Sequence, residues 1–117
     1  MSERIKIYQK PTCSKCRTAL RILNERGVEF DSVNYYETPL SAEELRGLID
    51  RLGISPRDLL RKDEQVYREL ELGQRDFSDD ELISLMIDNP DLMQRPIVVR
   101  GDRAVLGRSP ETVEELL

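Results

Sequence analysis

The sequence predicts an α/β fold in which a mixed four-stranded sheet is interrupted by a helical segment. Three observations support this prediction: a strand–helix–strand order in the first third, a helical stretch in the middle, and a β-hairpin followed by a helix at the end. Strands joined through a helix run parallel with a right-handed crossover, whereas hairpin strands run antiparallel. The expected order is therefore βαβ, a helical insert, then ββα.

The first third of the chain alternates between strand and helix patterns. Ile5, Ile7 and Tyr8 form a short β-type run that stops at Pro11 and predicts a strand. A helix is expected from about Cys13 to Gly27, because glycine suits the position just past a helix end. Its core positions have helical spacing: Cys16, Ala19, Leu20 and Leu23. A second strand is expected over residues 28–33.

The middle of the chain, residues 38–90, is expected to be helical. Two Ser-x-x-Glu sequences, beginning at Ser41 and Ser78, match the capping box that satisfies free amides at a helix start. Ser55-Pro56 adds a weaker start, because proline is favoured at the first helical position. Asn89-Pro90 closes the segment. Its charged residues are expected on a solvated outer face, among them Glu69, Glu71, Asp79 and Asp80.

The last third returns to β structure. Two β-type runs within residues 96–106 flank Gly101-Asp102, which predicts a hairpin with a type II′ turn. Ser109-Pro110 then opens a final helix with an N-cap serine and a proline at the first position. No repeat or long linker divides the chain, so we predict a single domain over residues 1–117. Its core comprises about 4–36 and 94–117, and its helical insert comprises about 40–90.

The composition limits the chemistry of the protein. The chain has 117 residues, a formal net charge of −5 at pH 7, no His and two Cys. The lack of His excludes Ser-His and Cys-His nucleophiles, imidazole acid–base catalysis and His-ligated zinc or haem. Two Cys cannot complete a four-ligand zinc site within one chain, so we expect no metal. The negative charge argues against direct nucleic-acid binding, which needs a basic surface.

No segment has the pattern of a targeting signal or a membrane span. Residues 1–10 alternate polar and apolar side chains and lack the apolar core of a secretory signal. Nothing approaches about 18 consecutive apolar residues. We therefore expect a cytoplasmic protein without membrane contact. Separately, we expect a monomer. In that compartment a lone cysteine pair is more often redox-active or catalytic than structural.

The strongest chemical signal is Cys13-Ser14-Lys15-Cys16, which lies where a strand turns into a helix. The segment around it is basic: residues 1–27 have a net charge of +5, whereas the remaining 90 residues have −10. A helix N-terminus offers free amides and the positive end of the helix dipole, which favour a thiolate. Three nearby cations are expected to stabilise it further: Lys10, Lys15 and Arg17.

Cys16 lies one helical turn beyond Cys13, within reach of a disulfide. A CxxC sequence at a strand-to-helix turn is typical of a thioredoxin-like (glutaredoxin-like) fold. Two other interpretations stay open at this point: a pair of buried thiols, and half of a zinc site shared by a dimer.

Three arginines outside the basic segment also stand out: Arg61, Arg95 and Arg108. The planar guanidinium group suits tetrahedral oxyanions, although a single arginine is more often solvated or salt-bridged. In a thioredoxin-like fold the residue before the strand proline faces the active cysteine, and that peptide bond is commonly cis. Arg95 is therefore expected near Cys13, with Pro96 as a structural residue of the site.

Several segments together resemble the glutaredoxin-coupled arsenate reductases of the ArsC family, from Ile5 to about Leu117. These segments are residues 8–13, 36–40, 53–62, 95–99 and 107–110. The resemblance implies a thioredoxin-like fold with an inserted helical subdomain and an enzyme of arsenic detoxification. It implies that Cys13 attacks arsenate or a similar oxyanion, and that Arg61, Arg95 and Arg108 form the oxyanion site. It also implies no bound cofactor, with glutathione as co-substrate and glutaredoxin as partner.

Two positions depart from the family pattern. Gln9 stands where the best-known members carry a His that is thought to assist thiol ionisation. Cys16 stands where they carry Ser or another residue, and the CxxC is similar to that of Spx-type redox regulators and dithiol glutaredoxins. Three functions follow from the sequence. The first is arsenate reduction, with glutathione and glutaredoxin or Cys16 supplying the second thiol. The others are an Spx-like redox-sensing transcription regulator and a general thiol–disulfide oxidoreductase.

Overall fold

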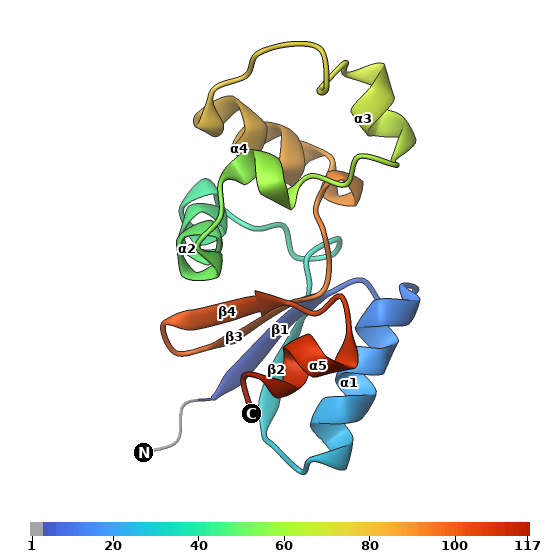
Figure 1. Cartoon of the computed structure of the whole chain (residues 1–117), viewed down its shortest axis with the longest axis vertical. Helices are drawn as coiled ribbons and strands as arrows, with labels where there is room; N and C mark the ends of the chain where they lie inside the picture. Colours follow the sequence, from blue (N-terminus) through green and yellow to red (C-terminus); the bar gives the residue numbers. More distant parts are fainter. Residues whose placement is uncertain (1–3) are drawn as a thin grey trace. The chain divides into compact units, whose positions relative to one another are not determined.

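The computed structural model describes residues 4–117, which divide into two compact units (Figure 1). Unit 1 runs to Thr38 and resumes with Arg95–Leu117, and unit 2 is Pro39–Gln94. Residues 1–3, with which the basic N-terminal segment begins, lie outside the described residues. The assignment of both units to a single domain stays a prediction.

Unit 1 is built on a four-stranded sheet with the strand order β2-β1-β3-β4. Its strands are β1 (Ile5–Gln9), β2 (Phe30–Asn34), β3 (Ile97–Arg100) and β4 (Arg103–Leu106). β1 pairs parallel with β2 and antiparallel with β3, and β3 pairs antiparallel with β4 (Figure 1). The predicted mixed sheet is therefore confirmed.

Two helices of unit 1, α1 (Ser14–Glu25) and α5 (Pro110–Glu114), contact each other and share a core with the sheet. This core contains Ile5, Ile7, Ala19, Leu23, Val98, Val113 and Leu116. α1 begins after Cys13 and ends before Gly27, and α5 is capped by Ser109, as predicted. The βαβ–ββα arrangement confirms the thioredoxin-like fold.

The hairpin between β3 and β4 has the predicted turn. Gly101 has a φ of 62°, whereas Asp102 is not among the described residues with positive φ. A type I′ turn needs positive φ at both central residues, and a type II′ turn needs it only at the first. Gly101-Asp102 therefore forms the predicted type II′ turn.

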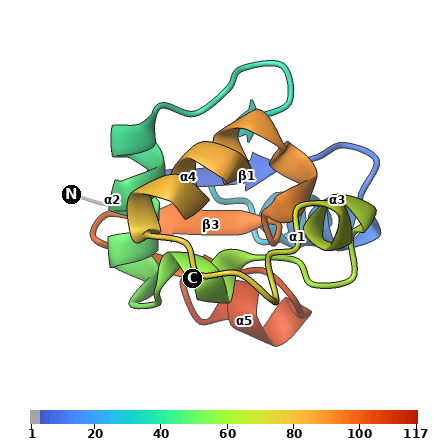
Figure 2. The same ribbon diagram turned by 90° about the horizontal axis from the view of Figure 1, so that it is seen from above.

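Unit 2 is helical. It contains α2 (Ala42–Leu52), the 3₁₀ helix η1 (Pro56–Leu59), α3 (Gln65–Glu69), α4 (Asp79–Asp88) and the 3₁₀ helix η2 (Pro90–Leu92). α4 contacts α2, η1 and η2, and α3 contacts η2 (Figure 2). Both predicted capping boxes are present, at the start of α2 and of α4.

The helical prediction for residues 38–90 is wrong in two stretches. Ser55-Pro56 starts only four residues of 3₁₀ helix. Leu60 then adopts an extended conformation (φ −70°, ψ 141°) and forms a β-bridge with Met93, which ends the helix. Residues 70–78 are turns and irregular structure. In the first stretch the local start signal is overridden because the bridge between Leu60 and Met93 pairs backbone groups that are distant in sequence.

The helices are short by the standard of membrane spans. α1 has 12 residues, whereas a span needs about 20 predominantly apolar ones. Within residues 4–117 no helix combines the length and the apolarity needed to cross a bilayer.

Candidate active site

One edge of the sheet in unit 1 gathers the residues that can carry chemistry. β1 and β2 are parallel and in register up to their last residues, Gln9 and Asn34. β3 runs antiparallel to β1, so its first residue lies at the same edge. The segments after β1 and β2 and the segment before β3 therefore meet there. They contain Cys13, Tyr35 and Arg95, respectively.

The loop after β1 places Cys13 at the start of α1. Its backbone N–H donates to the carbonyl of Lys10 (3.0 Å), which closes a turn, and its own carbonyl accepts the first helical hydrogen bond from Arg17 (3.0 Å). Cys13 is thus the N-cap residue, in an extended conformation. The half-buried sulfur is available for chemistry at the positive end of the helix.

Several groups act on the ionisation of the Cys13 thiol. Burial raises its pKa, but hydrogen bonds to the sulfur from the backbone N–H and thiol of Cys16, the backbone N–H of Lys15 and the Arg95 guanidinium lower it. The net effect is a pKa below the usual thiol value. Because the thiolate is the nucleophilic form, this arrangement prepares Cys13 for attack.

Cys16 has the opposite environment. It is fully buried on the inner face of α1, and burial raises its pKa to about 11. The Lys10 backbone N–H donates to its sulfur (3.4 Å) and opposes this shift, while the neighbouring Cys13 reinforces it. The pair therefore consists of an accessible thiol that ionises more readily than usual and a buried thiol that ionises less readily.

The three cations predicted to stabilise the thiolate contribute in different ways. Lys15 reaches Cys13 through its backbone N–H, and the Arg17 backbone N–H bonds to the Cys13 carbonyl. The Lys10 ammonium lies over the ring of Tyr36, 4.8 Å from its centroid. Stabilisation of the thiolate by the side-chain charges of these residues stays a prediction.

Arg95 is half-buried and directly precedes Pro96, and the peptide bond between them is cis. Its guanidinium hydrogen-bonds to Cys13 and lies near Tyr35 and Tyr36. The structure therefore brings Arg95 and Cys13 together, and a cation stands beside the sulfur at any accessible pH.

Arg108 lies beside the first turn of α1. It lines a groove of about 120 Å³ together with Ser14, the residue that follows Cys13, and Lys15. The other side of the groove is formed by the β4–α5 loop, which includes Ser109. Arg108 is exposed, so its side chain is accessible to an anion from solvent.

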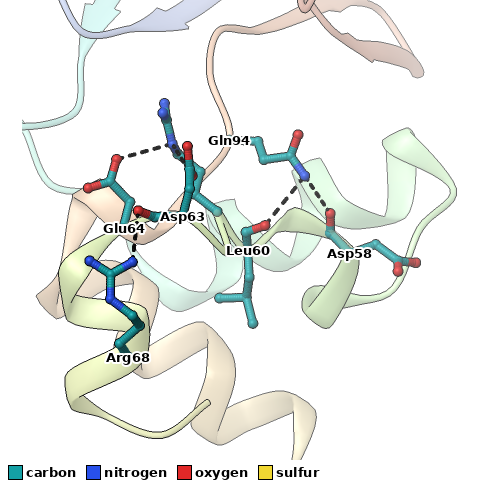
Figure 3. A network of polar contacts seen from close by, with 7 residues as sticks. Asp58, Leu60, Asp63, Glu64, Arg68 and Gln94 are labelled. Atoms are coloured by element: carbon teal, nitrogen blue, oxygen red, sulfur yellow. Dashed lines mark hydrogen bonds and ion pairs between the residues drawn. The ribbon is translucent and has the colours of Figure 1, made fainter. Parts of the chain in front are cut away.

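Arg61 belongs to unit 2. Its Nε lies 3.3 Å from Glu64 Oε1 and 3.9 Å from Asp63 Oδ1, and its backbone N–H donates to the Leu92 carbonyl (2.7 Å). Gln94 ties the same segment together by donating to the carbonyls of Asp58 and Leu60 (Figure 3). The role of Arg61 in an oxyanion site stays a proposal.

This site can perform thiol chemistry on an anion. The Cys13 sulfur supplies a nucleophile, Arg95 supplies a positive charge next to it, and Cys16 supplies a second sulfur one turn away. Among residues 4–117 no group of three or more His, Cys, Asp or Glu side chains gathers in a way that could hold a metal ion.

Comparison with known proteins identifies the family, since the profile of the ArsC family matches residues 8–116. The chain belongs to the ArsC family. It is 48% identical to the Escherichia coli K12 protein YfgD, over 100% of this chain and 99% of that one. It is 39% identical to an arsenate reductase of Neisseria meningitidis, over 97% of each chain. A solved arsenate reductase from Vibrio cholerae is 41% identical over the full length of both chains, with a TM-score of 0.94.

In this ArsC family protein the position of Gln9 has a clear structural role. Its side-chain amide donates to the Ser32 hydroxyl on the neighbouring strand (3.0 Å), and Gln9 is buried. Gln9 thus links β1 to β2, and the groups that lower the pKa of Cys13 are amides, Cys16 and Arg95.

Tyr35 is the site residue that the sequence did not reveal. It follows β2 directly and is buried, and its hydroxyl is under the electrostatic influence of Arg95, Cys16 and Cys13. The only signal in the sequence was an aromatic pair, Tyr35-Tyr36, at the end of a predicted strand. That pattern has no distinctive spacing and is common at strand ends.

Proposed function

We propose that this protein is an arsenate reductase in which the Cys13 thiolate attacks arsenate. The observation that carries the proposal is the accessible Cys13, whose pKa is lowered and whose sulfur lies beside the Arg95 guanidinium. The names of relatives in the same family support the choice of substrate. Arsenate is a dianion near pH 7, and its repulsion of a thiolate is about 1 kcal/mol at 4 Å in bulk water and more in a drier site. Arg95 offsets this repulsion.

In the first step the Cys13 sulfur forms a bond to As(V), and one As–O bond breaks. The departing oxygen leaves as water after protonation, and arsenic keeps its oxidation state in the covalent adduct. Arg95 stabilises the negative charge on the remaining oxygens. Arg108 and Arg61 enter the proposal through the family resemblance, and the exposed position of Arg108 beside the first turn of α1 is compatible with that role.

In the second step another thiolate attacks, and arsenic is reduced. Cys16 offers an intramolecular route: its sulfur bonds to Cys13 Sγ, the S–As bond breaks, and the electron pair of that bond reduces As(V) to As(III). Arsenite leaves, and the resulting disulfide is reduced by glutathione and glutaredoxin. Alternatively, glutathione attacks the adduct in place of Cys16.

A coupled assay with arsenate, glutathione, glutaredoxin, glutathione reductase and NADPH tests this function. Arsenate-dependent NADPH oxidation is expected for the wild type and its loss for Cys13→Ser, while Ser14→Ala serves as a neighbouring control. Turnover that survives in Cys13→Ser would refute the proposed nucleophile. Cys16→Ser separates the two routes, because full activity in this variant would show that glutathione alone completes the cycle.

A second candidate is a general thiol–disulfide oxidoreductase, which the Cys13–Cys16 pair favours. A low-pKa thiolate hydrogen-bonded to a buried thiol is suited to disulfide exchange as well as to attack on an oxyanion. Reduction of a mixed glutathione disulfide in the absence of arsenate measures this activity. A protein that reduces the disulfide but shows no arsenate-dependent turnover is an oxidoreductase of this second kind.

A further inference from the structure

Tyr35 carries a buried hydroxyl that no described residue satisfies. The side chain is 3% exposed, and by hydrogen-bond geometry its hydroxyl oxygen has no partner among residues 4–117, although the Arg95 guanidinium lies close enough to lower the pKa of the phenol. Buried polar groups in folded proteins are almost always hydrogen-bonded, because leaving one unpaired is costly. An unpaired hydroxyl inside a candidate active site therefore indicates a position kept for a ligand.

The phenol is held in one place by its neighbours. Its ring packs against that of Tyr36, with centroids 5.1 Å apart and planes tilted by 38°. The Lys10 ammonium lies over the Tyr36 ring. Tyr35 follows β2 at the sheet edge where the Cys13 loop and Arg95 also lie. The side chains of Arg95, Cys16 and Cys13 all influence the ionisation of its hydroxyl, so the polar end of the side chain lies near the reactive sulfur and its cation.

We propose that the Tyr35 hydroxyl is a further substrate-binding group of this site, which donates a hydrogen bond to an oxygen of the arsenate beside Cys13. This inference rests on the proposed function. Arg95 supplies positive charge to the anion, and Tyr35 supplies a neutral donor. A donor already oriented toward the developing charge needs no reorganisation during the reaction. A hydrogen bond from a hydroxyl to an oxyanion is also shorter and stronger than one between neutral groups.

The ionisation of Tyr35 is consistent with a donor. Burial raises the pKa of its phenol above the usual value, and the Arg95 guanidinium opposes only part of that shift. The side chain therefore keeps its proton throughout the neutral range. A phenolate at this position would repel both the Cys13 thiolate and an arsenate dianion.

A structural role and a ligand-binding role predict different behaviour for Tyr35→Phe, which removes only the hydroxyl oxygen. A hydroxyl that supports the fold through a partner would destabilise the protein on removal. A hydroxyl kept for arsenate has no partner to lose, so the melting temperature of the ligand-free variant should equal or exceed that of the wild type. Loss of folding in Tyr35→Phe would therefore overturn the inference.

Protection of Cys13 from iodoacetamide by arsenate measures binding without any need for turnover. We expect protection of Tyr35→Phe to need about 10- to 100-fold more arsenate than the wild type, which corresponds to the loss of one hydrogen bond to a charged group. The pH midpoint of alkylation without arsenate should be unchanged. Tyr67→Phe is the matched control, because its hydroxyl lies next to Gly73 in unit 2.

The outcomes separate the two proposals. If arsenate protects the wild type and Tyr35→Phe equally well, the role of Tyr35 is refuted while the proposed function stands. If the wild type shows neither arsenate protection nor arsenate-dependent turnover, the proposed function fails and the inference fails with it. A raised arsenate requirement in Tyr35→Phe alone, with Tyr67→Phe like the wild type, is the expected result.

Discussion

Gly107 is the position where the structure makes the sharpest prediction about stability. A Cβ atom added there would lie 2.7 Å from Pro96 Cγ and 3.3 Å from Val113 Cγ2. The first distance is shorter than real Cβ contacts allow, and a proline ring has no flexible end that could move aside. The Gly107 N–H also donates to the Pro96 carbonyl (2.8 Å), which fixes the two backbones together. Gly107→Ala therefore forces a backbone shift beside the candidate active site.

The expected size of the effect combines two opposing contributions. Overpacking of a tight contact costs about 1–3 kcal/mol. Alanine also restricts the unfolded chain, which returns about 0.4–1 kcal/mol. Gly107→Ala should therefore lower the free energy of unfolding by about 1–2 kcal/mol, and urea denaturation should show a midpoint lower by about 0.5–1 M. Because Arg95 directly precedes Pro96, the pKa of Cys13 should rise in the same variant.

Gly47→Ala is the matched control, since it makes the same chemical change inside α2. There the new Cβ meets only Arg51 Nη1 at 3.8 Å, an ordinary contact at the end of a flexible side chain. Alanine in a helix interior is favoured over glycine by about 0.5–1 kcal/mol, so this variant should be more stable than the wild type. The steric argument is refuted if Gly107→Ala is as stable as the wild type.

Three further predictions concern ionisation and helix capping. The rate of Cys13 alkylation should have its pH midpoint below the ordinary thiol value, and Arg95→Gln should raise this midpoint because it removes a cation that lowers the pKa. The pKa of Cys16 is about 11 in the folded protein, whereas a thiol in the unfolded chain has a pKa of about 8.5. Urea denaturation should therefore show the wild type losing stability relative to Cys16→Ala as pH rises between these values. Ser41→Ala should lower the free energy of unfolding by about 1 kcal/mol, because the Ser41 hydroxyl accepts a hydrogen bond in the capping box of α2. Ser84→Ala, an exposed position in α4, should change it by less than about 0.5 kcal/mol.

Each of these expectations has a clear contradiction. An alkylation midpoint at or above the ordinary thiol value would mean that burial outweighs the hydrogen bonds to Cys13. A pH dependence of stability that is identical in wild type and Cys16→Ala would show that Cys16 has no raised pKa in the folded state. Equal losses in Ser41→Ala and Ser84→Ala would remove the capping box as a source of stability.

The features that sequence reasoning predicted well depend on neighbours in the chain. The start of α1 after Cys13 and the capping box at Ser41 each involve groups within about four residues of one another. The parallel pair of β1 with β2 and the antiparallel hairpin of β3 with β4 also followed from the connections, whereas the place of β3 beside β1 came only from the structure. The start at Ser55-Pro56 is confirmed, but the helix that it opens is only four residues long, since the bridge between Leu60 and Met93 follows directly and depends on a distant segment.

By itself, the sequence determined the α/β fold, the cysteine pair at a helix start and the arginine before the strand proline. Hydrophobic spacing, capping residues and turn residues act locally, so they can be recognised in the sequence. Only the tertiary structure decided that the pKa of Cys13 is lowered while that of the chemically identical Cys16 is raised. Only the tertiary structure left the Tyr35 hydroxyl buried without a geometric hydrogen bond to any of residues 4–117. Burial and electrostatic environment depend on which distant segments of the chain come into contact. The pKa of a side chain therefore depends on its surroundings in the fold as well as on its residue type.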